Sequence, residues 1–270
     1  MKKEWYGNIN QTILSDEVES YVEDVRIKGF TVLEGIVAES ELTVIRELID
    51  EVYSIQVAEF GLEKLKAIDE EDICRFCLKY NEKFISVASN TKVLQVVRRL
   101  LGDFHILNLQ NAILNRPSKK HRQSAWHRDL PYLNSICSGS LAVSALFAID
   151  DFSELSGGTV VLPYSHKLRE LPSNEYIEKQ QLSIEIKAGC VVLFDAMLFH
   201  RAADNNSSSV RRALNHMYTI PIIKQQYDIS SVLKENKITD SRTRMLLGGT
   251  SIVPADDVAW RNAKLEKIGK

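Results

Sequence analysis

The first hundred residues carry apolar side chains at helical spacing. Leu42, Ile45 and Ile49 share one stripe of their segment, which is typical of an amphipathic helix. Glycines at 29 and 102 mark two helix ends. The pattern predicts helices at 16–30, 39–53, 58–68 and 83–101. A short strand is predicted at 30–33.

Beyond residue 102 the pattern changes to short apolar runs separated by turn signals such as Asn115-Arg116-Pro117-Ser118 and Ser156-Gly157-Gly158. Many short strands without intervening helices favour a sandwich or a barrel. The runs of strand length are 104–114, 141–149, 158–162, 182–186, 190–194 and 213–220. Short helices are predicted again at 229–234 and 240–247.

No repeat, low-complexity tract or linker divides the chain, and 270 residues suit one large β-containing domain. We therefore expect a single domain over 1–270. It would comprise a helical N-terminal region of about 1–102, a β core of about 103–222, and C-terminal helices over about 223–270. The fold class expected is mainly β with flanking α-helices.

Charge and composition exclude several classes of function. A formal net charge of −2 gives no support for nucleic-acid binding or membrane-surface binding. The N-terminus lacks the apolar core of a signal peptide, and no apolar run approaches the length of a membrane span. We expect a cytoplasmic protein with a small-molecule substrate, whose oligomeric state the sequence leaves open.

The four cysteines fit a reducing compartment better than a disulfide framework. Cys74 and Cys77 form a CxxC, which could be half of a zinc site or a redox pair. No second CxxC accompanies it. The favoured alternative is that both thiols lie on one side of a helix and pack in the core.

The clearest candidate chemistry lies in Trp126-His127-Arg128-Asp129, together with the distant His200. His127 and Asp129, two residues apart, point the same way at a strand end. Two imidazoles and one carboxylate can hold ferrous iron and leave positions open for a co-substrate and O2, although zinc could also bind. Taken singly, each residue could instead cap a turn or be a satisfied core side chain.

Several motifs resemble the phytanoyl-CoA dioxygenase family of Fe(II)- and 2-oxoglutarate-dependent oxygenases. They extend over nearly the whole chain, at 28–36, 126–129, 157–166, 188–195 and 200–212. The resemblance implies a double-stranded β-helix core (a cupin-like jelly roll). It implies His127, Asp129 and His200 as catalytic iron ligands, and Arg211 as the partner of the distal 2-oxoglutarate carboxylate. Strand alternation allows only one of Arg211 and Arg212 to face the interior.

Other positions follow from the resemblance with less support from the residues themselves. Ser144 and Asn115 fall where relatives place polar groups near the co-substrate, and His166 is expected to be structural. The loop 119–122 could recognise an anionic group or simply be solvated. Further residues expected to contact the substrate are Arg122, Gln123, Arg128 and Tyr132.

Asp129 also bears on the reaction, because halogenating relatives carry a small residue in its place. The resemblance therefore implies hydroxylation of a C–H bond in a small metabolite, with Fe(II), 2-oxoglutarate and O2 consumed to release succinate and CO2. Two alternatives remain: a catalytically silent β-barrel that binds a metal or ligand, and an oxygenase that acts on a protein partner.

Overall fold

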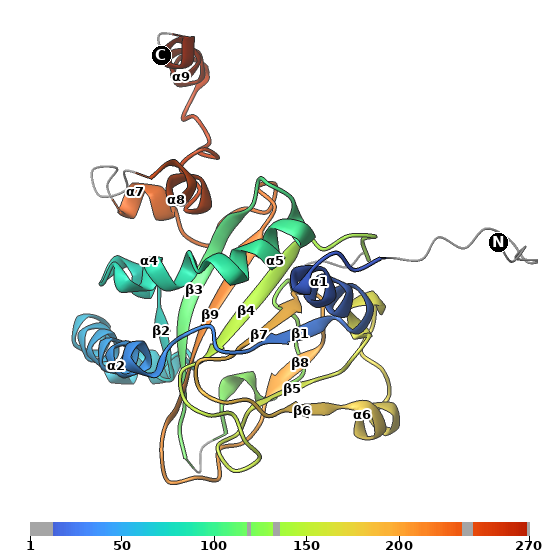
Figure 1. Ribbon diagram of the computed structural model, residues 1–270. Coiled ribbons are helices and arrows are strands. Elements are labelled where there is room, and N and C mark those ends of the chain that lie inside the picture. Colours follow the sequence, from blue (N-terminus) through green and yellow to red (C-terminus); the bar gives the residue numbers. More distant parts are fainter. Residues whose placement is uncertain (1–12, 118–119, 132–135, 234–239, 269–270) are drawn as a thin grey trace, which may run out of the picture.

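The computed structural model describes residues 13–117, 120–131, 136–233 and 240–268. Within these ranges two antiparallel sheets form a jelly roll, and helices flank it (Figure 1). The large sheet has the order β1-β7-β4-β9-β3-β2, and the small sheet has the order β6-β5-β8. The expected fold class is confirmed.

The strands agree closely with the apolar runs of the sequence. In the large sheet they are β1 (Phe30–Leu33), β7 (Val191–Asp195), β4 (Ala142–Ala148), β9 (Arg211–Thr219), β3 (Ile106–Asn115) and β2 (Ile73–Arg75). The small sheet contains β6 (Leu182–Ile184), β5 (Thr159–Val161) and β8 (His200–Ala202). Both outer strands of the large sheet, β1 and β2, come from the N-terminal region.

Helices such as α1, α2 and α5 cover the outer face of the large sheet, whereas α6 lies beside the small sheet (Figure 1). Asp16 caps the first helix by accepting from the Glu19 backbone N–H at 2.9 Å, and Gly29, with φ of 91°, ends that helix in a left-handed turn. The helices are α1 (Glu17–Lys28), α2 (Glu39–Phe60), α3 (Leu62–Ala67), α4 (Lys83–Ala88), α5 (Thr91–Leu101), α6 (Asn174–Gln180), α7 (Ile229–Val232), α8 (Ser241–Leu246) and α9 (Asp257–Ile268). Short 3-10 turns lie at Cys77–Lys79, Arg122–Ser124 and Ser165–Lys167.

The alternation of side chains along β4 separates two apolar cores. Val143, Ala145 and Phe147 pack under the helices. Leu146 and Ala148 point the other way, into the space between the sheets. Because the space between the sheets is lined from both sides by strands, polar groups placed there are shielded from water.

Some elements differ from the sequence-based expectation. Segment 83–101 is two helices, because the Asn90 side chain caps a new helix by accepting from the backbone N–H groups of Lys92 and Val93. Helix 39–53 continues to Phe60. The strands β2 and β8 were not predicted, since three-residue strands carry little periodicity, and the helices α6 and α9 were missed as well.

The CxxC does not lie on a helix, and that prediction was wrong. Cys74 belongs to β2, Phe76 has φ of 53°, and Cys77 begins a 3-10 turn. Both thiols are free and buried in the core under the helices. Burial raises the pKa of Cys77 to about 12 and raises the pKa of Cys74 further, so neither forms a reactive thiolate at neutral pH. The packing role is the one supported.

Among the described residues, no helix combines the length and the apolar character needed to cross a bilayer.

Candidate metal centre

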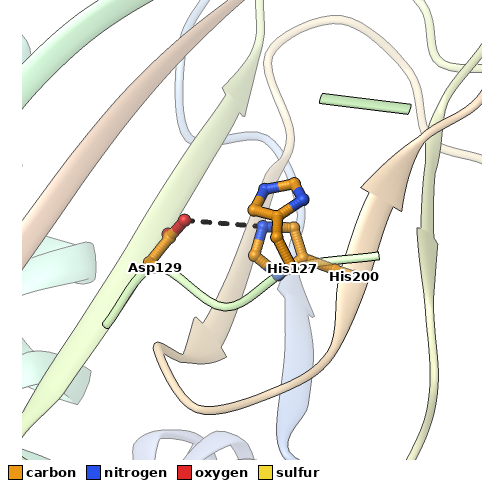
Figure 2. A group of neighbouring side chains, drawn as sticks. All are labelled: His127, Asp129 and His200. Atoms are coloured by element: carbon orange, nitrogen blue, oxygen red, sulfur yellow. Dashed lines mark ion pairs between the residues drawn. The ribbon is translucent and has the colours of Figure 1, made fainter. Parts of the chain in front are cut away.

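The His127–Asp129 segment lies against the turn that leads into β8. His127 and His200 exchange backbone hydrogen bonds as an isolated antiparallel bridge, at 3.0 and 3.1 Å. The Asp129 backbone N–H donates to Ala196 O at 3.0 Å. This extended pairing turns the side chains of residues 127 and 129 toward His200, as Figure 2 shows.

The three side chains form a compact donor cluster. One ligand atom from each of His127, Asp129 and His200 lies within 4.8 Å of the others, and this is the one such group found in the described part of the chain. His200 Nε2 is 3.5 Å from Asp129 Oδ1, and the imidazole centroids are 4.3 Å apart. Two nitrogens and one oxygen thus converge on one point.

Backbone carbonyls fix the tautomer of both imidazoles. His127 Nδ1 donates to Ala125 O at 2.8 Å, and His200 Nδ1 donates to Leu198 O at 3.0 Å. In a neutral ring this leaves each Nε2 with the lone pair that a metal requires. Among the described residues, His127 Nε2 is buried with no hydrogen-bond partner. A buried acceptor without a partner is costly, and a metal ion at this point would satisfy it.

Asp129 is oriented by a hydroxyl from the large sheet. Ser144 Oγ, buried on the inner face of β4, donates to Asp129 Oδ2. The other oxygen, Oδ1, is the one that faces His200. Ser144 therefore supports the carboxylate, and its expected place near the co-substrate stays a prediction.

The electrostatics keep His200 neutral. Burial lowers the pKa of this imidazole, the Asp129 carboxylate opposes the shift, and neighbouring His127 adds to it. A neutral imidazole is the form that coordinates a metal. Two imidazoles and one carboxylate fit ferrous iron with open positions on one side, and the donor set is compatible with the iron expected from the sequence.

Arg211 and Arg212 are separated by the alternation of β9. Arg211 is buried between the sheets, where Nε donates to Gly157 O at 2.9 Å and the guanidinium lies 4.5 Å from the Phe152 ring centroid. Burial lowers the pKa of Arg211 to about 10, so it remains charged at neutral pH. Arg212 points to the helices and binds Asp50.

The forked end of Arg211 is open to the metal centre. Among the described residues, no acceptor bonds to its Nη atoms. Arg211 lines a small cavity with His127, Asp129 and His200, which we call the inner cavity. A buried cation facing a cavity next to three metal-ligating side chains is a binding position for a carboxylate.

Three further polar residues of the inner cavity were missed by the sequence reasoning. Thr159 of β5, Arg201 of β8 and Asn215 of β9 line it, and Asn215 Oδ1 is buried without a partner in the described residues. Asn215 could have been found, because it lies on the same face of one strand as Arg211, four positions away. Thr159 carried no comparable signal.

Comparison with known proteins agrees with this geometry. Residues 25–213 match the sequence profile of the family described as phytanoyl-CoA dioxygenase (PhyH). The chain belongs to the phytanoyl-CoA dioxygenase family. This confirms the resemblance drawn from the motifs, and together with the donor cluster it supports a function of the Fe(II)/2-oxoglutarate oxygenase class.

Relatives within and beyond the family extend the comparison. Uncharacterized proteins from Mycobacterium bovis and Mycobacterium tuberculosis are each 32% identical over 233 residues, covering 83% of this chain and 84% of theirs. A protein named dioxygenase hkm4, from Aspergillus hancockii, is 27% identical over 147 residues, covering 53% of this chain and 45% of its own.

A solved structure shares the fold. It is that of the non-heme α-ketoglutarate-dependent epimerase SnoN from nogalamycin biosynthesis, with a TM-score of 0.57 and 17% identity. The match covers 75% of this chain and 82% of SnoN. At this identity the likeness concerns the jelly roll alone.

The remaining residues proposed from the family pattern have varied surroundings. Asn115 lies opposite Arg211 in the β3–β9 register, but its amide donates to Ala203 O at 2.9 Å, so it ties β3 to the loop after β8. Gln123 lines the inner cavity, and its contact with the substrate stays a prediction. Tyr132 lies outside the described residues.

Arg128 makes extensive contacts within the protein, and its expected contact with the substrate stays a prediction. Its guanidinium lies 3.8 Å from the Phe199 ring centroid and donates to four backbone carbonyls, at positions 165, 168, 169 and 197. His166, expected to be structural, is buried and bonds through Nε2 to Arg26 O at 3.2 Å. Both side chains hold the loop beside the metal centre.

Proposed function

We propose that this chain is a non-haem Fe(II)- and 2-oxoglutarate-dependent oxygenase that hydroxylates a C–H bond of a small metabolite. The observation that carries the proposal is the inner cavity. The guanidinium group of Arg211 and the three donor side chains His127, Asp129 and His200 all line it. Metal and co-substrate carboxylate thus have separate, adjacent positions.

The three ligands would hold the iron from one side. Ferrous iron with bound 2-oxoglutarate and O2 supplies the oxidising chemistry, and succinate and CO2 are released. The protein's part is orientation: the carbonyls of Ala125 and Leu198 hold the imidazoles, and Ser144 holds the carboxylate. The apolar walls, including Phe194 and Leu146, exclude water from the reacting groups.

Arg211 would bind the distal carboxylate of 2-oxoglutarate. Its guanidinium is planar, buried and held at Nε by Gly157 O, so binding costs little reorganisation. Its pKa of about 10 reflects burial without a close anion, and a bound carboxylate would stabilise the charged form.

Hydroxylation is favoured over halogenation because Asp129 fills the third ligand position. Product mass separates hydroxylation from the epimerisation named for the fold relative SnoN, since an epimerised product keeps the mass of its substrate. A hydroxylated product gains one oxygen atom.

The test is a screen for substrate-stimulated turnover. Purified protein with Fe(II), ascorbate and 2-oxoglutarate is incubated with a metabolite library, and succinate and product mass are measured. We expect succinate formation coupled to a product heavier by one oxygen, and loss of both in His127→Ala. Equal succinate formation by His127→Ala would overturn the metal assignment.

Metal binding distinguishes the oxygenase from a silent binding barrel. Both would bind Co(II) through the same cluster, but only the oxygenase would bind 2-oxoglutarate at the metal and release succinate. Co(II) spectra that do not respond to 2-oxoglutarate, together with no succinate formation across the library, would favour the silent barrel.

A further inference from the structure

A second cavity adjoins the metal centre. It has a volume of about 310 Å³ and shares His127, Gln123, Ile113 and Asn215 with the inner cavity. We call it the outer cavity. Three arginines and no acidic residue are among its described lining residues, so its walls favour a negatively charged occupant.

Next to the outer cavity lies a larger groove between α2, α3 and the segment around Tyr227, and its lining mixes apolar and aromatic side chains with charged ones such as Glu59 and Lys79. Its volume is about 640 Å³, and we call it the helix groove. Phe60 and Ile68 are about half exposed along it, and Phe76 stacks on Tyr227 with 4.8 Å between ring centroids. Exposed apolar and aromatic side chains around a concave surface are typical of a binding site for an apolar group.

Two arginines line both the outer cavity and the helix groove. Arg75 holds Glu70 through two hydrogen bonds of 2.6 and 2.5 Å, from Nε and Nη2. Its third nitrogen, Nη1, donates at 3.0 Å to the side-chain oxygen of Asn111, in the amide orientation that also lets the Asn111 nitrogen donate to Gln110 O. Arg75 is thus fully engaged within the protein.

Arg122 is held at one nitrogen and open at the others. Its Nη1 donates to Asp69 O at 3.0 Å and to Glu70, while Nε and Nη2 have no acceptor among the described residues. Burial acts to raise the pKa of Glu70, but the two arginines outweigh it and hold the pKa below the usual value. One ionised carboxylate therefore balances two guanidinium groups, and one positive charge remains.

We propose that Arg122 is a specificity-determining residue that binds an anionic group of an amphiphilic substrate, whose apolar body lies in the helix groove. Arg75 and Glu70 position Arg122, and the anionic group directs the rest of the molecule through the outer cavity toward His127. The anion can be a carboxylate, sulfonate or phosphate, since a guanidinium fork binds each. The substrate role rests on the proposed function, but the binding site does not.

A pair of fluorescent probes tests the site without metal or turnover. Anilinonaphthalene sulfonate carries an aromatic body and an anionic group, and N-phenyl-naphthylamine has a closely similar body without charge. We expect wild-type protein to bind the sulfonate about tenfold more tightly than the neutral probe, as one anion–guanidinium contact would give. Equal affinity for the two probes, or binding of neither, would overturn the proposal.

Four variants locate the binding. Arg122→Gln should weaken the sulfonate probe about tenfold and leave the neutral probe unchanged, and Arg122→Lys should restore part of the loss. Phe60→Ser should weaken both probes together. The matched control is Arg98→Gln, whose arginine pairs with Asp103 on the surface and should affect neither probe. Unchanged binding of the sulfonate probe by Arg122→Gln would show that a residue other than Arg122 binds the anionic group.

The outcome separates this site from the oxygenase proposal. Charge discrimination that depends on Arg122 in a protein without 2-oxoglutarate turnover would leave the anion site standing and overturn the proposed function. Succinate formation by a protein that binds the charged and neutral probes equally would support the proposed function and overturn the anion site. Fold integrity of every variant is checked by its unfolding temperature.

Discussion

The two faces of β9 place similar residues in opposite surroundings. On the outer face, Arg212 binds Asp50 through two hydrogen bonds of 2.9 and 2.7 Å and Asp150 through one of 3.1 Å. On the inner face, Arg211 has one bond to the protein, and its open end faces the metal-ligating side chains. An arginine whose charge is already neutralised by carboxylates of the protein, such as Arg212, supports the fold. A buried arginine without such a partner, such as Arg211, can bind an anionic ligand.

The largest effect should come from removing a metal ligand on the inner side. Asp129→Ala leaves two imidazoles and should weaken Co(II) or Fe(II) binding by more than about 100-fold, because even loss of an outer-shell partner costs 10–100-fold. Isothermal titration with Co(II) measures this. His216→Gln, on the outer face of β9, should keep wild-type affinity. Similar affinity in Asp129→Ala and wild type would show that the cluster is not the metal site.

The next effect separates the two arginines. Arg211→Gln removes the proposed carboxylate partner and should raise the KM for 2-oxoglutarate by about 30-fold or more, as for loss of one partner of a buried charge pair. Steady-state succinate formation measures it.

Arg212→Gln is the matched control for that experiment. It should leave the KM unchanged and lower the free energy of unfolding by about 1 kcal/mol, because its ion pairs are partly exposed. If Arg212→Gln raised the KM and Arg211→Gln did not, the assignment of the two faces would be reversed.

A smaller effect is expected at the hydroxyl that orients Asp129. Ser144→Ala leaves the ligands in place but frees the carboxylate to rotate, and should weaken Co(II) binding about tenfold. Ser54→Ala, on α2, removes a hydroxyl that bonds only to a helix carbonyl and serves as the control. An affinity for Co(II) that Ser144→Ala does not lower would mean that Asp129 is oriented by the backbone alone.

The smallest effect concerns a buried histidine on the outer face of β9. Burial lowers the pKa of His216 to about 3, against an ordinary value of 6.5. The unfolded chain therefore binds a proton below pH 6.5 that the folded chain does not, so stability is present above pH 6.5 and is lost as the pH falls. Between pH 6.5 and 5.5 this costs about 1 kcal/mol.

Urea unfolding at the two pH values checks this contribution. His216→Gln should reduce the difference in unfolding free energy between them by about the same 1 kcal/mol. An undiminished difference in the variant would assign the acid sensitivity to other groups, such as the buried His105, whose pKa burial also lowers.

The sequence predicted the long strands and the shared direction of His127 and Asp129 because both depend on local pattern, whereas the distant His200 was joined to them as a ligand through the family resemblance. Alternation along β4 and β9 fixes which side chains point inward, and His127 and Asp129 share a direction in an extended segment. The same alternation alone left the choice between Arg211 and Arg212 open, since either face could have been the inner one. The family resemblance chose Arg211, and the helices over the other face of the sheet, where Arg212 binds Asp50, agree with that orientation.

Other features depend on contacts that no local pattern contains. The CxxC looked helical because spacing alone cannot tell a helix from a strand followed by a tight turn at Phe76. Arg128 donates to distant carbonyls around position 168, which no spacing in the sequence indicates. Arg75 belongs to β2, a strand too short to be predicted from the sequence. The pairing of β2 with the large sheet places Arg75 beside Arg122 in the lining of the outer cavity.

The origin of the two outer strands has a consequence for synthesis on the ribosome. β1 emerges early, but Phe30 pairs with Phe194, so this strand waits without a partner until most of the chain has been made. β2 likewise pairs with β3 across the intervening helices α4 and α5. Such non-local pairing slows folding. A fragment that begins at residue 103 would expose the edges of β7 and β3, and we expect it to aggregate rather than fold.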